Sequence, residues 1–246
     1  LQRKTVDPEI WKGLDFGHVD LTKITGGARR SEFIVIAGAQ KSGKTMWGLF
    51  LATEFSKQLK MQGNDEVVLV VSLEMRHSGL AGRVLSNLSD INVSKFRDFE
   101  LDDDDWPKLD SGIAELEKLP VLWNVACYSI EGIEALVEEY KDQIRVVIVD
   151  YFQLMTTSSG TRRHEQLEDI SRRLKQIAMM GDITVIALSQ QTREALTDAK
   201  RAKDPNTLAG TQSLARDADM LLIILPHIKD GFDLPHIRDI YVALSR

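Results

Sequence analysis

The stretch that most constrains this chain follows the apolar run 33–37 and fits the pattern GxxxxGK[ST]. Its eight residues are Gly38, Ala39, Gln40, Lys41, Ser42, Gly43, Lys44 and Thr45. An apolar β-branched run, a glycine-rich turn and a helix-forming segment in this order predict a phosphate-binding loop between a strand and a helix. The glycines let backbone N–H groups point at an anion, and the helix N-terminus adds the positive end of its dipole.

A nucleoside triphosphate is the ligand that such a loop fits best. Lys44 is then placed to reach the β- and γ-phosphates, and the Thr45 hydroxyl is placed to bind Mg²⁺. The sequence therefore predicts a binding site for ATP and Mg²⁺ in residues 38–45.

The composition of the chain is that of a soluble globular protein. Of its 246 residues, 43% are hydrophobic and 28% are charged, and no apolar run is long enough to predict a membrane span. The single cysteine, Cys127, has no partner for an internal disulfide, which is compatible with a reducing cytoplasm. The net charge of −6 argues against a surface that is basic all over, but it leaves room for a local basic strip.

Strand and helix patterns alternate from residue 33 onward, which predicts an α/β fold with a mostly parallel central sheet and helices on both faces. We expect residues 33–246 to form one domain and residues 1–32 to be a lead-in or linker segment packed on its core. Apolar side chains at helical spacing predict core-facing helices within 133–140 and 163–180. The predicted strands are 33–37, 67–73, 120–124, 145–150, 183–189, 219–225 and 237–244.

Two further patterns predict local structure without chemistry. The stretch 225–230 is echoed by 234–239 across residues 231–233, which predicts a C-terminal β-hairpin. The acidic run from Asp102 to Asp105 precedes Trp106-Pro107, and we expect a solvated loop that leads to a helix start.

Three polar residues close or follow predicted strands and are expected at the carboxyl edge of the sheet, beside the phosphate loop. Asp150 ends one apolar run and is a candidate Mg²⁺ partner, although an acid can also simply end a strand. Glu74 is a candidate base for an attacking water, and its position equally fits an acid at a helix start. Gln190 ends a third strand, where a neutral amide could contact the γ-phosphate.

These stretches together resemble the C-terminal motor domain of DnaB-type replicative DNA helicases, which are hexameric RecA-like ATPases and include phage-type relatives. The matching stretches occur in the family's order and cover the chain from about residue 25 to its end. They are the phosphate loop, Ser72-Leu73-Glu74-Met75 with Arg83, the run 149–155, the run 170–175, Ala187-Leu188-Ser189-Gln190 with Arg193, and Asp217-Ala218-Asp219.

The resemblance implies a role for each candidate residue. It implies that Glu74 is the catalytic base, that Asp150 is the acid associated with Mg²⁺, and that Gln190 senses the γ-phosphate and is coupled to DNA-contacting loops. It also implies that Arg246 is an arginine finger that completes the site of a neighbouring subunit. The family usually has a lysine two residues before this finger, where the present chain has Leu244.

The implied function is an ATP-driven helicase motor that assembles as a homo-oligomeric ring of six subunits, encircles single-stranded DNA and unwinds duplex DNA in the cytoplasm of a bacterial or phage-infected cell. Residues 193–216 carry five basic and three acidic side chains, a net charge of +2 that leaves −8 for the rest of the chain. A basic strip on an acidic body suits a ring that contacts phosphates through its channel. The candidate DNA contacts are Arg193, Lys200, Arg201 and Lys203.

Two other functions remain open at this stage. One is a RecA-like ATPase that does not unwind DNA, as in a recombinase-like filament or a clock-type ring. The other is a nucleotide-gated assembly or loader module that hydrolyses ATP poorly. The family's N-terminal helical domain has no counterpart in these residues, so the chain is either an excised motor or a compact relative. The sequence predicts nothing about primase or loader partners.

Overall fold

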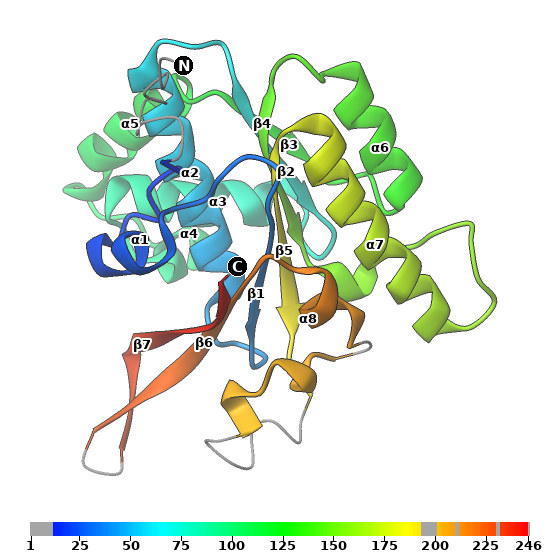
Figure 1. The fold of residues 1–246 in the computed structure, drawn as a ribbon. Coiled ribbons are helices and arrows are strands. Elements are labelled where there is room, and N and C mark those ends of the chain that lie inside the picture. The colour runs from blue at the N-terminus through cyan, green and yellow to red at the C-terminus, as the bar shows by residue number, and fades with distance from the viewer. Residues whose placement is uncertain (1–11, 193–200, 210–211, 230–231, 246) are drawn as a thin grey trace, which may run out of the picture.

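Strand β1 (Phe33–Gly38) lies inside a sheet whose strand order is β3-β2-β4-β5-β1-β6-β7 (Figure 1). The computed structural model describes residues 12–192, 201–209, 212–229 and 232–245. The other strands are β2 (Val67–Ser72), β3 (Val121–Asn124), β4 (Ile144–Asp150), β5 (Thr184–Gln190), β6 (Met220–Lys229) and β7 (Phe232–Ser245). Neighbouring strands pair in parallel from β3 to β6, and β6 and β7 pair antiparallel. The predicted strands and the predicted α/β class are confirmed.

Helices cover both faces of this sheet, and its central strands are therefore buried on both sides. Side chains of β1 alternate between two cores: Phe33 and Val35 pack with α6 and α7, and Ile34 and Ile36 pack with α2 and α3. The helices are α1 (Val19–Thr25), α2 (Lys44–Gln62), α3 (His77–Ser89), α4 (Val93–Asp98), α5 (Asp105–Leu116), α6 (Ile130–Glu139), α7 (Arg163–Gly181) and α8 (Ser213–Asp217). Within the described residues, no helix is long and apolar enough to cross a membrane.

The segment that precedes β1 packs on the core. Leu14, Phe16 and Leu21 are buried against side chains of α2, and the Phe16 ring lies 6.0 Å from the Phe55 ring between centroids. The backbone of Leu14 also forms an antiparallel bridge with Ala28. These contacts bury aromatic and aliphatic surface, which favours folding by about 1.5 to 3 kcal/mol for each large side chain.

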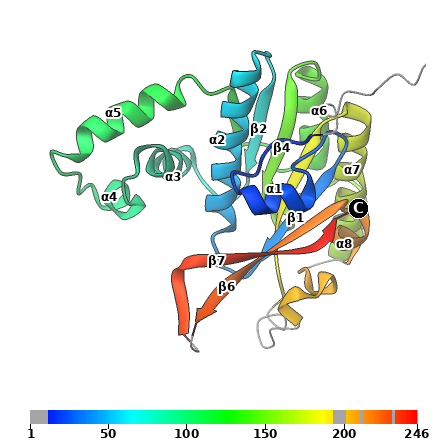
Figure 2. The ribbon, with the colours of Figure 1, turned by 60° about the vertical axis from the view of Figure 1, so that its left-hand side comes forward.

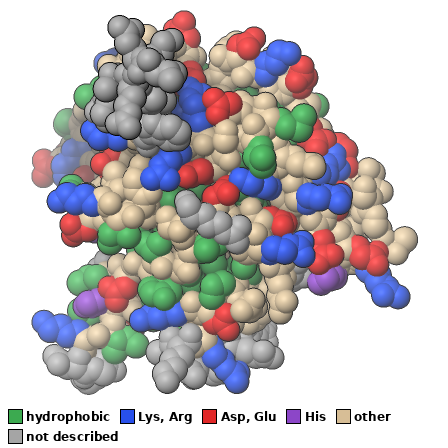
Figure 3. Space-filling view, viewed as in Figure 1, with side chains coloured by type: hydrophobic (Ala, Val, Ile, Leu, Met, Phe, Trp, Pro, Cys, Tyr) green, Lys and Arg blue, Asp and Glu red, His purple; other side chains and the backbone are tan. Residues whose placement is uncertain are grey.

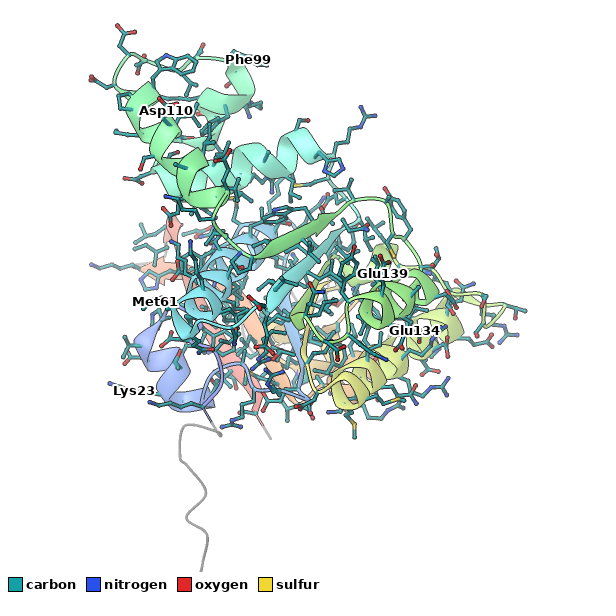
Figure 4. The ribbon with its side chains drawn as sticks, turned by 90° about the horizontal axis from the view of Figure 1, so that it is seen from above. Lys23, Met61, Phe99, Asp110, Glu134 and Glu139 are labelled. Atoms are coloured by element: carbon teal, nitrogen blue, oxygen red, sulfur yellow. The ribbon has the colours of Figure 1, made fainter. Side chains whose placement is uncertain are left out.

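Helices α3, α4 and α5 form an arm that projects from one side of the sheet (Figures 2 and 4). Phe99 lies at the far end of this arm and is almost fully exposed. The prediction of a solvated loop for residues 102–105 was wrong in one respect. Asp105 begins α5 but is buried, and its carboxylate accepts a hydrogen bond of 2.7 Å from Lys95. Helix α4 brings Lys95 back over this turn, which spacing along the sequence did not reveal.

The predicted C-terminal hairpin is confirmed by the pairing of β6 with β7. His227 of β6 contacts Asp239 of β7 at 2.9 Å, so one histidine of the repeated stretch has a structural partner across the hairpin. The hairpin extends beyond the body of the domain (Figure 1), and hydrophobic side chains are visible at the surface in this region (Figure 3). Ile228 of β6 and Ile237 of β7 are exposed.

Two of the stretches that carry the family resemblance contact each other. Ser171 of α7 donates a hydrogen bond of 2.7 Å to Asp217, and Lys175 donates one of 2.6 Å to Asp219. Asp219 also accepts a hydrogen bond of 2.7 Å from the backbone N–H of Phe33. These bonds fix α7 and the start of β6 against the first residue of β1.

A cluster of charges joins α7 to α6. The Arg173 guanidinium donates to Glu134 and, at 2.6 Å, to Glu131, both on α6, and lies 3.4 Å from Asp169 on its own helix. Figure 4 shows Glu134 on the helix that lies beside α7. The Arg173 side chain is 16% exposed, whereas the neighbouring Arg172 side chain is 66% exposed. Partial burial makes the Arg173 contacts stronger than ordinary surface ion pairs.

We expect Arg173→Met to lower the free energy of unfolding by about 1 to 3 kcal/mol, because Glu131 and Glu134 lose their charged donor. The matched control is Arg172→Met, which removes an exposed pair with Asp169 and is expected to cost about 0 to 1 kcal/mol. Urea denaturation measures both values. Equal losses in the two variants would contradict the structural role of Arg173.

The same cluster predicts a pH dependence of stability. Burial raises the pKa of Glu131, but hydrogen bonds from Arg173 and Ser158 outweigh this effect and lower the pKa from 4.5 to about 2. A carboxyl whose pKa is lower in the folded state stabilises the protein above its unfolded pKa, and this contribution is lost as the pH falls toward the folded pKa. The stability gap between the wild-type protein and Arg173→Met should therefore shrink between about pH 5 and about pH 2. Denaturation at several pH values tests this, and a gap that grows on acidification would refute it.

Candidate nucleotide-binding site

The carboxyl ends of four parallel strands meet at one edge of the sheet. The register pairs Gly38 of β1 with Gln190 of β5, and Ser72 of β2 with Asp150 of β4. A cavity of about 860 Å³ opens at this edge. Its lining includes the phosphate loop together with Glu74, Arg83, Asp150, Tyr151 and Gln190. The structure thus brings the candidate residues from three separate strand ends to the phosphate loop.

Two glycines are required by the shape of the loop. A Cβ atom at Gly38 would lie 2.6 Å from the Ser42 hydroxyl, so this loop conformation leaves no room for a side chain at position 38. Gly43 has a φ of 97° and caps the N-terminus of α2, a conformation that glycine adopts without strain. The first turn of α2 contains no acidic residue, and Gly43 makes no side-chain cap, so the helix terminus suits an anion.

Lys44 is buried under the loop. Its ammonium group donates hydrogen bonds to the carbonyl oxygens of Gly38 at 2.9 Å and Ala39 at 2.6 Å. Burial lowers the pKa of Lys44 to about 8, although the negative charges of Asp150 and Glu74 oppose this shift. A bound triphosphate would add negative charge beside the ammonium group and would favour its charged form.

Asp150 and Thr45 form the part of the cavity that fits a divalent cation. Burial raises the pKa of Asp150 to about 6, while the neighbouring Thr45 hydroxyl and the positive charges of Lys44 and Arg83 oppose this shift. Its second carboxylate oxygen, Oδ2, is buried with no hydrogen-bond partner. A hydroxyl and a free carboxylate oxygen are hard donors of the kind that Mg²⁺ binds. Within the described residues, no cluster of three His, Cys, Asp or Glu side chains offers another metal site.

Glu74 and Gln190 enter the cavity from different strands. Glu74 follows β2 by two residues, is exposed to the cavity, and is close enough to Asp150 and Lys44 for its charge to shift the pKa of both. Burial raises the pKa of Tyr151, and the neighbouring Gln190 side chain opposes this shift. Both positions agree with the predicted strand ends.

The remaining predicted site residues either fall outside the described residues or are absent from the cavity wall. Arg246, Arg193 and Lys200 fall outside the described residues. Arg201 and Lys203 form an exposed 3₁₀ turn, η4 (Arg201–Lys203), that is not part of the cavity wall.

Sequence reasoning missed part of the cavity lining. Tyr151 directly follows Asp150, and its position beside a strand end was a usable signal. Phe96, Arg97 and Phe99 of the arm form the far side of the cavity, a long way along the chain from the phosphate loop. No local pattern marks them, since only the fold of the arm brings them there.

The two ends of α2 allow a matched test of the loop. Gly43 and Gly63 both have positive φ values, 97° and 70°, and a Cβ atom at either position would meet nothing within 4 Å. We expect Gly43→Ala and Gly63→Ala each to lower the free energy of unfolding by about 1 to 2 kcal/mol. Only Gly43→Ala should weaken binding of a fluorescent ATP analogue, by about tenfold or more, because it distorts the phosphate loop. Equal nucleotide affinities in the two variants would show that this loop does not hold the phosphates.

Curated relatives of this chain are replicative helicases. It is 34% identical over 230 residues to a probable replicative DNA helicase of Trieres chinensis, covering 91% of this chain and 49% of that protein. It is 30% identical to the replicative DNA helicase DnaB of Buchnera aphidicola, covering 95% of this chain and 52% of the relative. The chain therefore spans about half the length of the curated relatives it matches.

Solved structures agree with these relatives. One solved ATPase domain superposes with a TM-score of 0.84 at 26% identity, covering 96% of this chain and 84% of that one. A DnaB-like replicative helicase, solved with its interactions with primase, also gives a TM-score of 0.84 at 27% identity and covers 96% of this chain and 57% of that one. The model of the DnaB-like helicase C-terminal domain matches residues 13–232, and the chain belongs to this family.

Proposed function

We propose that this chain is the ATP-hydrolysing motor of a replicative DNA helicase, with residues 33–246 as the motor domain and residues 1–32 as its lead-in. One observation supports this most strongly. A single cavity gathers a phosphate loop, a buried carboxylate with a free oxygen, a second carboxylate and a strand-end amide. These are the parts that hydrolysis of a nucleoside triphosphate needs.

Within this proposal, residues 38–45 hold the phosphates of ATP through backbone N–H groups, and Lys44 leaves its two carbonyl partners to contact the β- and γ-phosphates. Thr45 and Asp150 hold Mg²⁺, which neutralises charge on the transferring phosphoryl group. Glu74 accepts a proton from the attacking water. Gln190, which lies beside Tyr151, contacts the γ-phosphate and loses this contact as that phosphate leaves.

Assembly and DNA contact are the second part of the proposal. The chain forms a homo-oligomeric ring of six subunits, in which Arg246, the next residue in the sequence after β7, reaches the cavity of a neighbour. The projecting hairpin supports this, because Ile228 and Ile237 are exposed on it and are available to a neighbouring subunit. Arg193, Lys200, Arg201 and Lys203 then contact the backbone of single-stranded DNA in the central channel.

The base can be tested by replacing its carboxylate with an amide of the same shape. We expect Glu74→Gln to retain ATP binding and to lower DNA-stimulated ATP hydrolysis and forked-duplex unwinding by about 10² to 10⁴-fold, because the water loses its proton acceptor. The measurements are phosphate release and strand displacement.

The matched control is Glu139→Gln, since Glu139 is an exposed carboxylate on α6 (Figure 4). This variant should hydrolyse ATP and unwind DNA at the wild-type rate. Unwinding that survives Glu74→Gln would refute the assignment of the base. An active, DNA-stimulated ATPase ring without unwinding would favour a non-unwinding RecA-like motor, and binding of ATP without turnover would favour an assembly module.

A further inference from the structure

Residues 190–192, at the end of β5, lie beside residues 207–209 at the edge of the cavity, and we call these two strands of backbone the root. The backbone N–H of Ala209 donates to the Gln190 carbonyl at 2.8 Å, and that of Thr192 donates to the Thr207 carbonyl at 2.8 Å. Gln191 and Leu208 form an antiparallel bridge between these two bonds. These bonds therefore hold the two sides of the root together, and the candidate DNA-contacting turn η4 lies between them along the chain.

One side chain from another part of the chain spans this root. Gln153 uses its amide nitrogen to donate to the Ser189 hydroxyl and to the Ala209 carbonyl, both at 2.8 Å. Its amide oxygen accepts a hydrogen bond of 3.2 Å from the backbone N–H of Gln190. We call these three bonds the amide clamp. The clamp joins the end of β5 to the returning side of the root through one planar group.

The residue that carries the clamp is fixed to the metal side of the cavity. Gln153 lies in the 3₁₀ turn η2 (Phe152–Leu154), which follows Asp150 and Tyr151 directly. Phe152 is fully buried beneath this turn, and Arg163 of α7 donates a hydrogen bond of 2.7 Å to the Gln153 carbonyl. The backbone of Gln153 is thus held against the core. Because the core is close-packed, we expect a displacement of Asp150 to displace the Gln153 amide group as well.

The phosphate loop meets the same root. The carbonyl of Gly38 accepts both the Lys44 ammonium group at 2.9 Å and the backbone N–H of Gln191 at 3.1 Å. The Gln191 side chain is buried and donates to the Ala202 carbonyl in η4 at 2.8 Å. When a bound triphosphate attracts Lys44, the Gly38 carbonyl loses one of its two hydrogen-bond donors. The strength of its remaining hydrogen bond with the backbone N–H of Gln191 then changes.

We propose that Gln153 is a positioning residue that couples the nucleotide cavity to residues 201–209, so that the occupant of the cavity sets the geometry of the candidate DNA-contacting turn η4. This inference rests on the proposed function for the identity of the two ligands. The clamp requires a group that donates and accepts at once. Glutamate has the same shape but lacks the N–H donors, and methionine has a similar length without either function.

The first experiment needs no DNA. Hydrogen–deuterium exchange of the segment 201–209 is compared in the presence of Mg²⁺ with the ATP analogue AMP-PNP and with ADP. In the wild-type protein the two nucleotides should give exchange rates that differ by about threefold or more, because they set the root differently. In Gln153→Glu and Gln153→Met this difference should disappear, while both variants keep a cooperative thermal unfolding transition.

The second experiment measures the affinity for fluorescent oligo-dT with the same two nucleotides. We expect the ratio of affinities to fall from about tenfold or more in the wild-type protein to about twofold or less in both Gln153 variants. The matched control is Gln143→Glu, an exposed glutamine next to the opposite end of β4, which should keep the wild-type exchange difference and affinity ratio.

The outcomes separate the inference from the function on which it rests. A nucleotide-dependent exchange difference that persists in the Gln153 variants overturns the clamp, as does an equal loss of DNA affinity with both nucleotides, which is the mark of a merely structural role. A wild-type protein that binds no oligo-dT contradicts the proposed function, whereas an exchange difference that is present in the wild type and lost in the Gln153 variants still supports the clamp.

Discussion

Parallel pairing of β1 with β5 and of β2 with β4 is the constraint on which the site depends. The register sets Gly38 beside Gln190 and Ser72 beside Asp150, so that groups far apart along the chain share one edge of the sheet. Buried on both faces, these strands cannot slip by one residue without turning every core side chain to the wrong layer. The hydrophobic cores above and below the sheet therefore fix the position of the polar groups at its edge.

In the polar site at this edge, burial and charge–charge attraction act in opposite directions on the pKa values of Lys44 and Asp150. Burial lowers the pKa of Lys44 to about 8 and raises that of Asp150 to about 6, and each group partly offsets the desolvation of the other. The free Oδ2 of Asp150 and the unpaired hydroxyls of Ser42 and Ser72 are further buried polar atoms without partners in the described residues. Such atoms are rarely left unpaired in folded proteins, and those of Ser42 and Asp150 line the cavity, where they are available to a ligand.

Much of the fold and of the site followed from local patterns. Continuous apolar runs predicted the strands to within a few residues, because burial on both faces leaves no polar alternation to obscure them. The phosphate loop, Asp150, Glu74 and Gln190 were found because each lies at or just after the end of such a run. The buried Asp105, the cavity wall formed by Phe96 and Phe99, and the clamp formed by Gln153 were not found, since each acts through a contact with a distant segment.

The sequence alone determined that this chain carries a phosphate-loop pattern on a strand-turn-helix unit and belongs among alternating α/β folds. Glycine spacing and strand-forming runs are local properties, so residues 33–45 alone are enough to predict them. The tertiary structure decided which side chains meet the loop and how the segment after Gln190 is held. Hydrogen bonds such as those from Gln153 to Ser189 and Ala209 join three separate parts of the chain, and only packing of the sheet and its helices brings their atoms within reach.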